Sequence, residues 1–289
     1  MFQIIGIVVL FAMVFGSFII SGGKLAVILS ALPHELMAIG GAGVASFLIA
    51  NSLPVIKATG ANMKKVFGGP KWKAGDYRDL LSLLFLLTKT MKQKGVIALE
   101  SHIENPTESS IFTRFPSVMK DHFAVDFICD TLRMMTMNLE DPHQVEDAME
   151  AQLEKHHHES LRPSHALQSL ADALPALGIV AAVLGVIKTM GAITEPPEIL
   201  GEMIGGALVG TFLGVFLAYG LVGPMATRMK EVVEEEGSFY KIIQSVLVAH
   251  LHGNAAQISV EIGRGNVPSE AQPSFLELEE ALSNIPNES

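Results

Sequence analysis

Residues 174–225 of this chain read LPALGIVAAVLGVIKTMGAITEPPEILGEMIGGALVGTFLGVFLAYGLVGPM, and this stretch decides the fold. It holds two apolar runs of about 20 residues on either side of a short turn at 194–197, and a helix of about that length crosses the hydrocarbon core of a bilayer. Neither run has an Asp or Glu in its interior. The stretch therefore predicts a hairpin of two membrane-spanning helices.

The second run carries small residues at regular spacing. Gly206, Gly210 and Gly214 recur every four residues, which places them on one helix face. This strip is expected to let the helix backbone of a partner or a neighbouring chain come close inside a membrane. Thr211 adds a hydroxyl beside this strip. A hairpin with such a lining but without an acid indicates the wall of an ion pathway that a partner completes.

Two further apolar stretches lie near the start of the chain, at 4–20 and 36–53, and the loop expected between them contains Lys24 and Pro33. A cleaved signal peptide is the alternative for the first stretch, but no basic residue precedes Ile4. We therefore expect an all-α integral membrane protein with four transmembrane helices and a helical cytoplasmic domain. We also expect no Asp or Glu inside any span, so that this chain alone conducts no ions.

The distribution of positive charge orients the spans, because cytoplasmic loops are enriched in Lys and Arg. The segment after the second span is rich in lysine, whereas the two short loops carry only Lys24 between them. Both termini are thus expected in the cytoplasm, as fits a multi-pass protein with four spans. The expected divisions are transmembrane helices at 1–55, a cytoplasmic helical domain at 56–171, the channel-lining hairpin at 172–226, and a cytoplasmic helix and tail at 227–289.

Within the cytoplasmic parts, apolar spacing predicts several helices. Asp76 begins the first, which ends near Gly95, and a short one follows at 99–103. Another is expected at 121–138, a fourth opens at Pro142, and residues 273–282 fit one more short helix.

Composition excludes several classes of function. The net charge of −10 argues against nucleic-acid binding, and the chain lacks a nucleophile elbow or a phosphate-binding loop, so we expect no enzyme and no cofactor. The run at 156–158 is all histidine, but adjacent helical residues point about 100° apart, which does not suit one metal ion. Lys188 lies close enough to the outer turn for its side chain to reach the membrane interface.

Two prolines flank the hairpin at its cytoplasmic end. Pro175 stands at the start of the first run and Pro224 at the end of the second. Each either shapes a hinge between the membrane helices and the cytoplasmic domain or simply limits its helix, Pro175 in the first turn and Pro224 at the end. The sequence leaves both alternatives open.

Several long motifs, in order along the chain, resemble the flagellar motor stator protein A family, in particular its proton-driven members. These motifs are DALPALGIVAAVLGV at 172–186, LVGTFLGVFLAYGLVGP at 208–224, LESHIENP at 99–106, DFICDTLR at 126–133 and QPSFLELEE at 272–280. The resemblance covers most of the chain.

The resemblance implies a function in bacterial motility and chemotaxis. It implies a ring of five such chains around two copies of a single-span B subunit, whose membrane aspartate binds and releases the transported ion. Ion flow would then drive torque on the rotor switch protein. The alternative is a related energiser subunit of an outer-membrane import system that also uses the proton-motive force.

The resemblance also implies roles for individual positions. Lys92 and Glu100 match the residues that face the rotor. Positions matching the ion channel and its coupling are Pro175, Gly178, Ala182, Thr211, Tyr219 and Pro224. Because Ala182 offers no hydroxyl as a sodium ligand, H⁺ is the expected ion.

Overall fold

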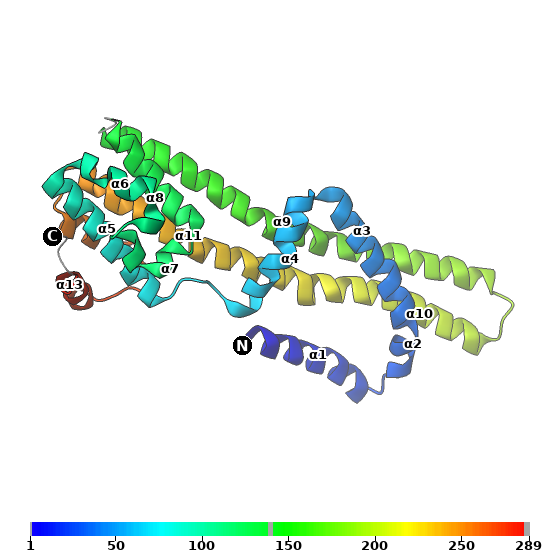
Figure 1. The fold of residues 1–289 in the computed structure, drawn as a ribbon. Coiled ribbons are helices and arrows are strands. Elements are labelled where there is room, and N and C mark those ends of the chain that lie inside the picture. Colours follow the sequence, from blue (N-terminus) through cyan, green and yellow to red (C-terminus); the bar gives the residue numbers. More distant parts are fainter. Residues whose placement is uncertain (1, 138–140, 286–289) are drawn as a thin grey trace. The chain divides into compact units, whose positions relative to one another are not determined.

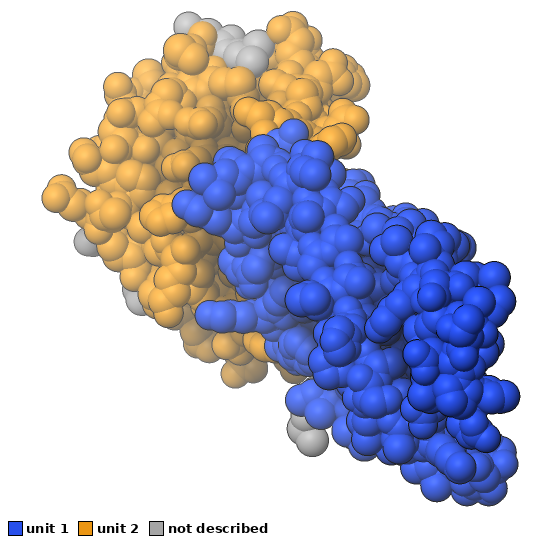
Figure 2. All heavy atoms as spheres, turned by 90° about the vertical axis from the view of Figure 1, so that its right-hand side faces the viewer, with its two compact units in different colours: residues 1–69, 160–232 blue, residues 70–159, 233–289 orange. Residues whose placement is uncertain are grey.

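The computed structural model describes residues 2–137 and 141–285, and in these ranges every regular element is a helix (Figure 1). The chain divides into two compact units, coloured separately in Figure 2. The membrane unit contains residues 1–69 and 160–232, and the second unit contains residues 70–159 and 233–289.

The membrane unit begins with α1 (Phe2–Ile20) and α2 (Leu25–Glu35), followed by the π-helical segment η1 (Leu36–Gly40). Its remaining helices are α3 (Gly41–Ala50), α4 (Leu53–Gly68), the C-terminal part of α9 (Pro142–Gly191), α10 (Pro197–Val215), the π-helical η5 (Phe216–Val222) and the start of α11 (Gly223–Leu251). Four of the described helices are long and apolar enough to span a membrane, which confirms the four expected spans. The chain is thus an all-helical membrane protein.

The second span differs from the prediction. It runs from Leu25 to Ala50 as one helix of 26 residues, so the expected loop around Pro33 is wrong. It also encloses Glu35, so the expectation that no span contains an acid is wrong as well. A proline inside a helix removes one N–H donor, and neighbouring helices and local π turns make that loss tolerable in a membrane; η1 supplies such a turn directly after Glu35.

Both prolines of the hairpin lie inside continuous helix. Pro175 is far from either end of α9, which spans 50 residues, and Pro224 lies where η5 passes into α11. The alternative in which these prolines limit their helices is therefore wrong. Before Pro224, η5 already departs from ordinary helical pairing, which accommodates the missing donor.

The second unit matches the expected helices closely. They appear as α5 (Ala74–Lys94), α6 (Glu100–Glu104), α8 (His122–Thr136), α9 from Pro142 and α13 (Phe275–Ser283). Asp76 is the third residue of α5, not its first, and its carboxylate accepts a hydrogen bond from the backbone N–H of Lys73 at 2.8 Å. Three further helices were not predicted from the sequence: α4, α7 (Pro116–Met119) and α12 (Ala256–Gly265). Phe112, Phe127 and Phe239 are among the fully buried side chains of this unit's core.

A buried carboxylate joins three parts of this core. Asp121 caps the N-terminus of α8, where it accepts a hydrogen bond from the backbone N–H of Ala124 at 2.8 Å. The same side chain pairs with Lys71 and accepts a hydrogen bond from the Tyr240 hydroxyl at 3.1 Å. Burial alone would raise the pKa of Asp121, but these donors outweigh it and hold the pKa below its usual value.

We expect Asp121 to make the second unit sensitive to acid. A lowered folded pKa stabilises the fold above the usual carboxyl pKa of about 3.9, and that stabilisation is lost as pH falls through the folded value. Asp121→Asn keeps the helix cap but removes the charge, and should cost about 1–2 kcal/mol at pH 7 and less than that at pH 3.

The single tryptophan provides the measurement. Trp72 is buried beside Lys71 and stacks on Phe239, with ring centroids 3.7 Å apart. Its fluorescence, followed during unfolding in detergent, reports this region. Asp126→Asn, at an exposed position of α8, is the control. An equal loss of stability from both variants at both pH values would contradict the prediction.

Candidate functional site

The hairpin of α9 and α10 is held together by direct backbone contact. A Cβ atom added at Gly178 would lie 2.9 Å from the backbone oxygen of Gly210, and one added at Gly214 would lie 2.7 Å from the backbone oxygen of Leu174. These distances are shorter than real Cβ contacts allow. The two helices, which run side by side in Figure 1, therefore need glycine at these positions.

The glycine strip of α10 is covered by helices of the same chain. Gly214 meets Gly178 of α9, whereas a Cβ added at Gly206 would lie 3.8 Å from the Cβ of Ala31 on α2. A Cβ added at Gly210 would lie 2.5 Å from Oε2 of Glu35, also on α2. The strip was expected to pack against a partner or a neighbouring chain, and at these three positions the chain supplies the packing itself.

The two candidate pore residues, Ala182 on α9 and Thr211 on α10, lie at one level of the hairpin. The Cβ of Ala181 is 3.2 Å from where a Cβ of Gly210 would stand, and Ala182 and Thr211 are the next residues of the two helices. Both are half-buried. A surface formed at this level presents one hydroxyl and no acid from α9 and α10.

The end of the hairpin that carries Pro224 is hollowed. Tyr219 and Pro224 line a cavity of about 440 Å³ that also touches Gln168 and Thr227, and both line a second cavity of about 350 Å³ beside α1 and α4. Arg228 borders both cavities and pairs with Glu231 at 3.2 Å. Tyr219 itself is 70% exposed, so the chain leaves its side chain available to another molecule.

Lys92 and Glu100 belong to the second unit. Lys92 is in the last turn of α5 and Glu100 is the first residue of α6. Gly95, with a φ of +82°, turns the chain between them, a conformation that favours glycine. Both charged side chains are exposed.

Glu35 is the residue that the sequence analysis missed. Its Oε2 atom is buried and has no hydrogen-bond partner among the described residues. Within the span at 25–50, a window of 18 residues reaches a mean hydropathy of 1.5. A search that allowed one proline and one acid inside an apolar run would therefore have found the residue.

The first residue of the histidine run at 156–158 packs against an aromatic side chain. His156 stacks on Phe123 with ring centroids 3.5 Å apart, and burial lowers its pKa. Within the described ranges, no group of three His, Cys, Asp or Glu residues could hold a metal ion.

Comparisons with known proteins identify the relatives of this chain. Residues 4–95 match the model for the motility protein A N-terminal region, and residues 120–241 match the model for the MotA/TolQ/ExbB proton channel family. The chain is 38% identical to motility protein A of Escherichia coli K12, over 99% of this chain and 97% of that protein. It is 35% identical to chemotaxis protein LafT of Vibrio parahaemolyticus, over 97% of this chain and 98% of that protein.

Two solved structures share the fold. The MotAB structure from C. jejuni aligns with a TM-score of 0.70 at 19% identity, over 94% of this chain and 98% of that chain. The flagellar MotAB stator complex from Bacillus subtilis aligns with a TM-score of 0.64 at 20% identity, over 89% of this chain and 92% of that chain. With a 38% identical relative that it matches over nearly its whole length, the chain belongs to the motility protein A family.

Proposed function

We propose that this chain is the A subunit of a flagellar motor stator, which forms a proton channel with a single-span B subunit and converts the proton-motive force into torque on the rotor switch protein. The observation that carries the proposal is the glycine-packed hairpin of α9 and α10, with Thr211 but no acid at its centre, in a chain of the motility protein A family. Proton passage through a membrane requires a titratable group, so the hairpin needs one from outside α9 and α10.

A partner span is the proposed source of that group. The solved relatives are described as MotAB complexes, and a B subunit with an aspartate in its helix would complete the channel. Large apolar side chains of α9 remain exposed within the membrane unit, among them Ile179 at 57% and Val183 at 52%. Such surfaces suit neighbouring chains or lipid, in keeping with a ring of five A chains around two B chains.

Loop charge supports the orientation. The lysines at 57, 64 and 65 follow the second span and lie on α4, which by the positive-inside rule places α4 and both termini in the cytoplasm. The protein would then lie in the bacterial inner membrane with the second unit facing the rotor.

The decisive experiment is reconstitution of the A chain in vesicles with and without its B subunit. Proton flux should require both chains, and replacement of the partner's membrane aspartate by asparagine should abolish it. Equal flux from the A chain alone would refute the proposed channel. An import energiser is disfavoured because the chain has four candidate spans and matches motility protein A over nearly its whole length.

We expect protons and not sodium to be the transported ion. Sodium coordination requires several oxygen ligands, and Ala182 supplies none beside Thr211. Swimming speed should follow the proton-motive force and stay constant when external sodium is exchanged for potassium at constant pH. Strict dependence on sodium, measured by tracking of single cells, would contradict this prediction.

A further inference from the structure

Glu35 lies at membrane depth. The second span begins at Leu25, and at about 1.5 Å per residue Glu35 is about 15 Å further along the helix. The span continues to Ala50, so Glu35 is well inside it. An ionisable group at such depth is costly and usually functional, and the hairpin mechanism described above does not use it.

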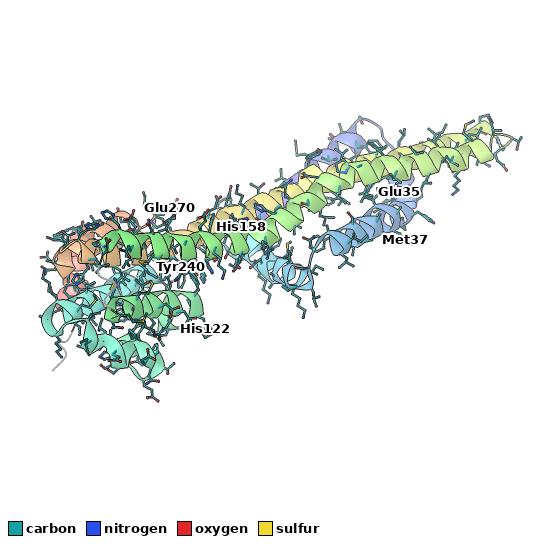
Figure 3. All side chains as sticks on the ribbon, turned by 90° about the horizontal axis from the view of Figure 1, so that it is seen from above. Glu35, Met37, His122, His158, Tyr240 and Glu270 are labelled. Carbon is teal, nitrogen blue, oxygen red and sulfur yellow. The ribbon has the colours of Figure 1, made fainter. Side chains whose placement is uncertain are left out.

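The carboxyl group of Glu35 points at the hairpin. A Cβ added at Gly210 would lie 2.5 Å from Oε2 and 3.2 Å from the carboxyl carbon. The carboxyl therefore occupies the space that a side chain at position 210 would fill, beside Thr211. Figure 3 shows Glu35 on α2 close to the hairpin helices.

Among the described residues, a protonated His34 is the one opposite charge that acts on this carboxyl. His34 is its neighbour on α2. The nearest charged side chains on α10 are Glu198 and Glu202, near its outer end. On the membrane part of α9 the nearest is Lys188, near the outer turn, and α1 and α3 carry no charged side chain. An unpaired ionised carboxylate is expensive to bury, whereas the protonated acid is far less so. The surroundings of Oε2 thus favour a carboxyl that holds a proton.

The helix around Glu35 is irregular on both sides. Pro33 cannot donate a backbone hydrogen bond to Leu29, and the π-helical η1 starts at Leu36. Such π segments are rare and often lie at functional sites. The residue as a whole is only partly buried, so water in the channel can reach the carboxyl when the contact with α10 loosens.

We propose that Glu35 is a proton-binding site of this chain, and that its proton occupancy sets how closely α2 packs on α10 at Gly210. The step is a single protonation: the carboxylate takes a proton from hydronium, which leaves as water, and no other bond changes. The protonated acid packs against Gly210, and the ionised form requires water and moves α2 away. This inference rests on the proposed function, because it supplies a second acid for the same proton path.

The first test detects the proton on Glu35 directly. Infrared difference spectra of the complex of A and B chains in vesicles, recorded between pH 5 and pH 8, should contain the C=O band of a protonated carboxyl that Glu35→Gln removes. Glu202→Gln, at an exposed position of α10, should leave that band in place. Gly210→Ala, which crowds Oε2, should shift its frequency. An unchanged spectrum in Glu35→Gln would overturn the proposal.

The second test measures proton flux in the same vesicles. Glu35→Gln imitates the protonated acid in size and should assemble normally, yet lower the flux at least fivefold, whereas Glu35→Asp should recover part of it. Flux within twofold of wild type in Glu35→Gln, at equal protein level, would overturn the role in transport. If instead the unmodified complex shows no flux that depends on the B subunit, the proposed function fails, while the infrared band still decides whether Glu35 binds a proton.

Discussion

Gly214→Ala should separate the hairpin helices and abolish motility. The added Cβ would lie 2.7 Å from the backbone oxygen of Leu174 and 2.9 Å from the Cα of Gly178. Both are backbone atoms that cannot rotate away, so α9 and α10 must move apart along their contact. Such overpacking costs about 1–3 kcal/mol.

The measurements are the melting temperature of the purified complex and the swimming of cells that carry the variant. A loss of 1 kcal/mol lowers the melting temperature of a unit of this size by about 2–4 °C. The melting temperature of the variant should therefore fall by about 2–12 °C. Gly201→Ala is the matched control, because it lies on α10 with nothing within 4 Å of the added Cβ and alanine favours a helix. If Gly214→Ala melts and swims as Gly201→Ala does, the close contact is not required.

The larger Gly210→Leu change combines two effects. Its side chain would meet both Ala181 on α9 and the Glu35 carboxyl on α2. It should block assembly with the B subunit, as judged by co-purification. Normal stoichiometry together with full motility would show that α2 can leave this position without consequence.

The hairpin could be predicted from the sequence because its signals are local. Two apolar runs of spanning length and a four-residue glycine repeat specify helices and a small-residue face without any tertiary information. Helices of the second unit follow from the same reasoning, since Asp76, Pro142 and the motif at 273–282 mark helix starts.

The contact between α2 and α10 and the continuity of the helices through their prolines could not be predicted in this way. Pro33, Pro175 and Pro224 suggest breaks when each is judged alone, but all three lie within continuous helices. Near Pro33 and Pro224 a π-helical segment accommodates the missing donor. Likewise, an acid ten residues after Leu25 suggests a loop. Only the packing of α2 on α10 shows that Gly210 leaves room for its carboxyl.

Reversal of charge at Lys92 or Glu100 should impair motility severely while the protein level in the membrane and the proton permeability of the complex stay normal. Both side chains are exposed on the second unit, and exposed charges contribute only about 0–1 kcal/mol to folding. Complementary charge does, however, govern which surfaces recognise each other and how fast they associate. A defect confined to torque would therefore place these residues at the rotor contact.

Lys94→Glu is the matched control, because it makes the same charge change at an exposed position two residues away. Swimming speed and immunoblots of membranes should show a defect for Lys92→Glu and Glu100→Lys but a smaller one for Lys94→Glu. A compensating reversal on the rotor switch protein should then restore part of the motion, since opposite charges face each other again. If the single reversals deplete the protein from the membrane, or if no reversal on the rotor side ever compensates, Lys92 and Glu100 support the fold of the second unit and not its recognition of the rotor.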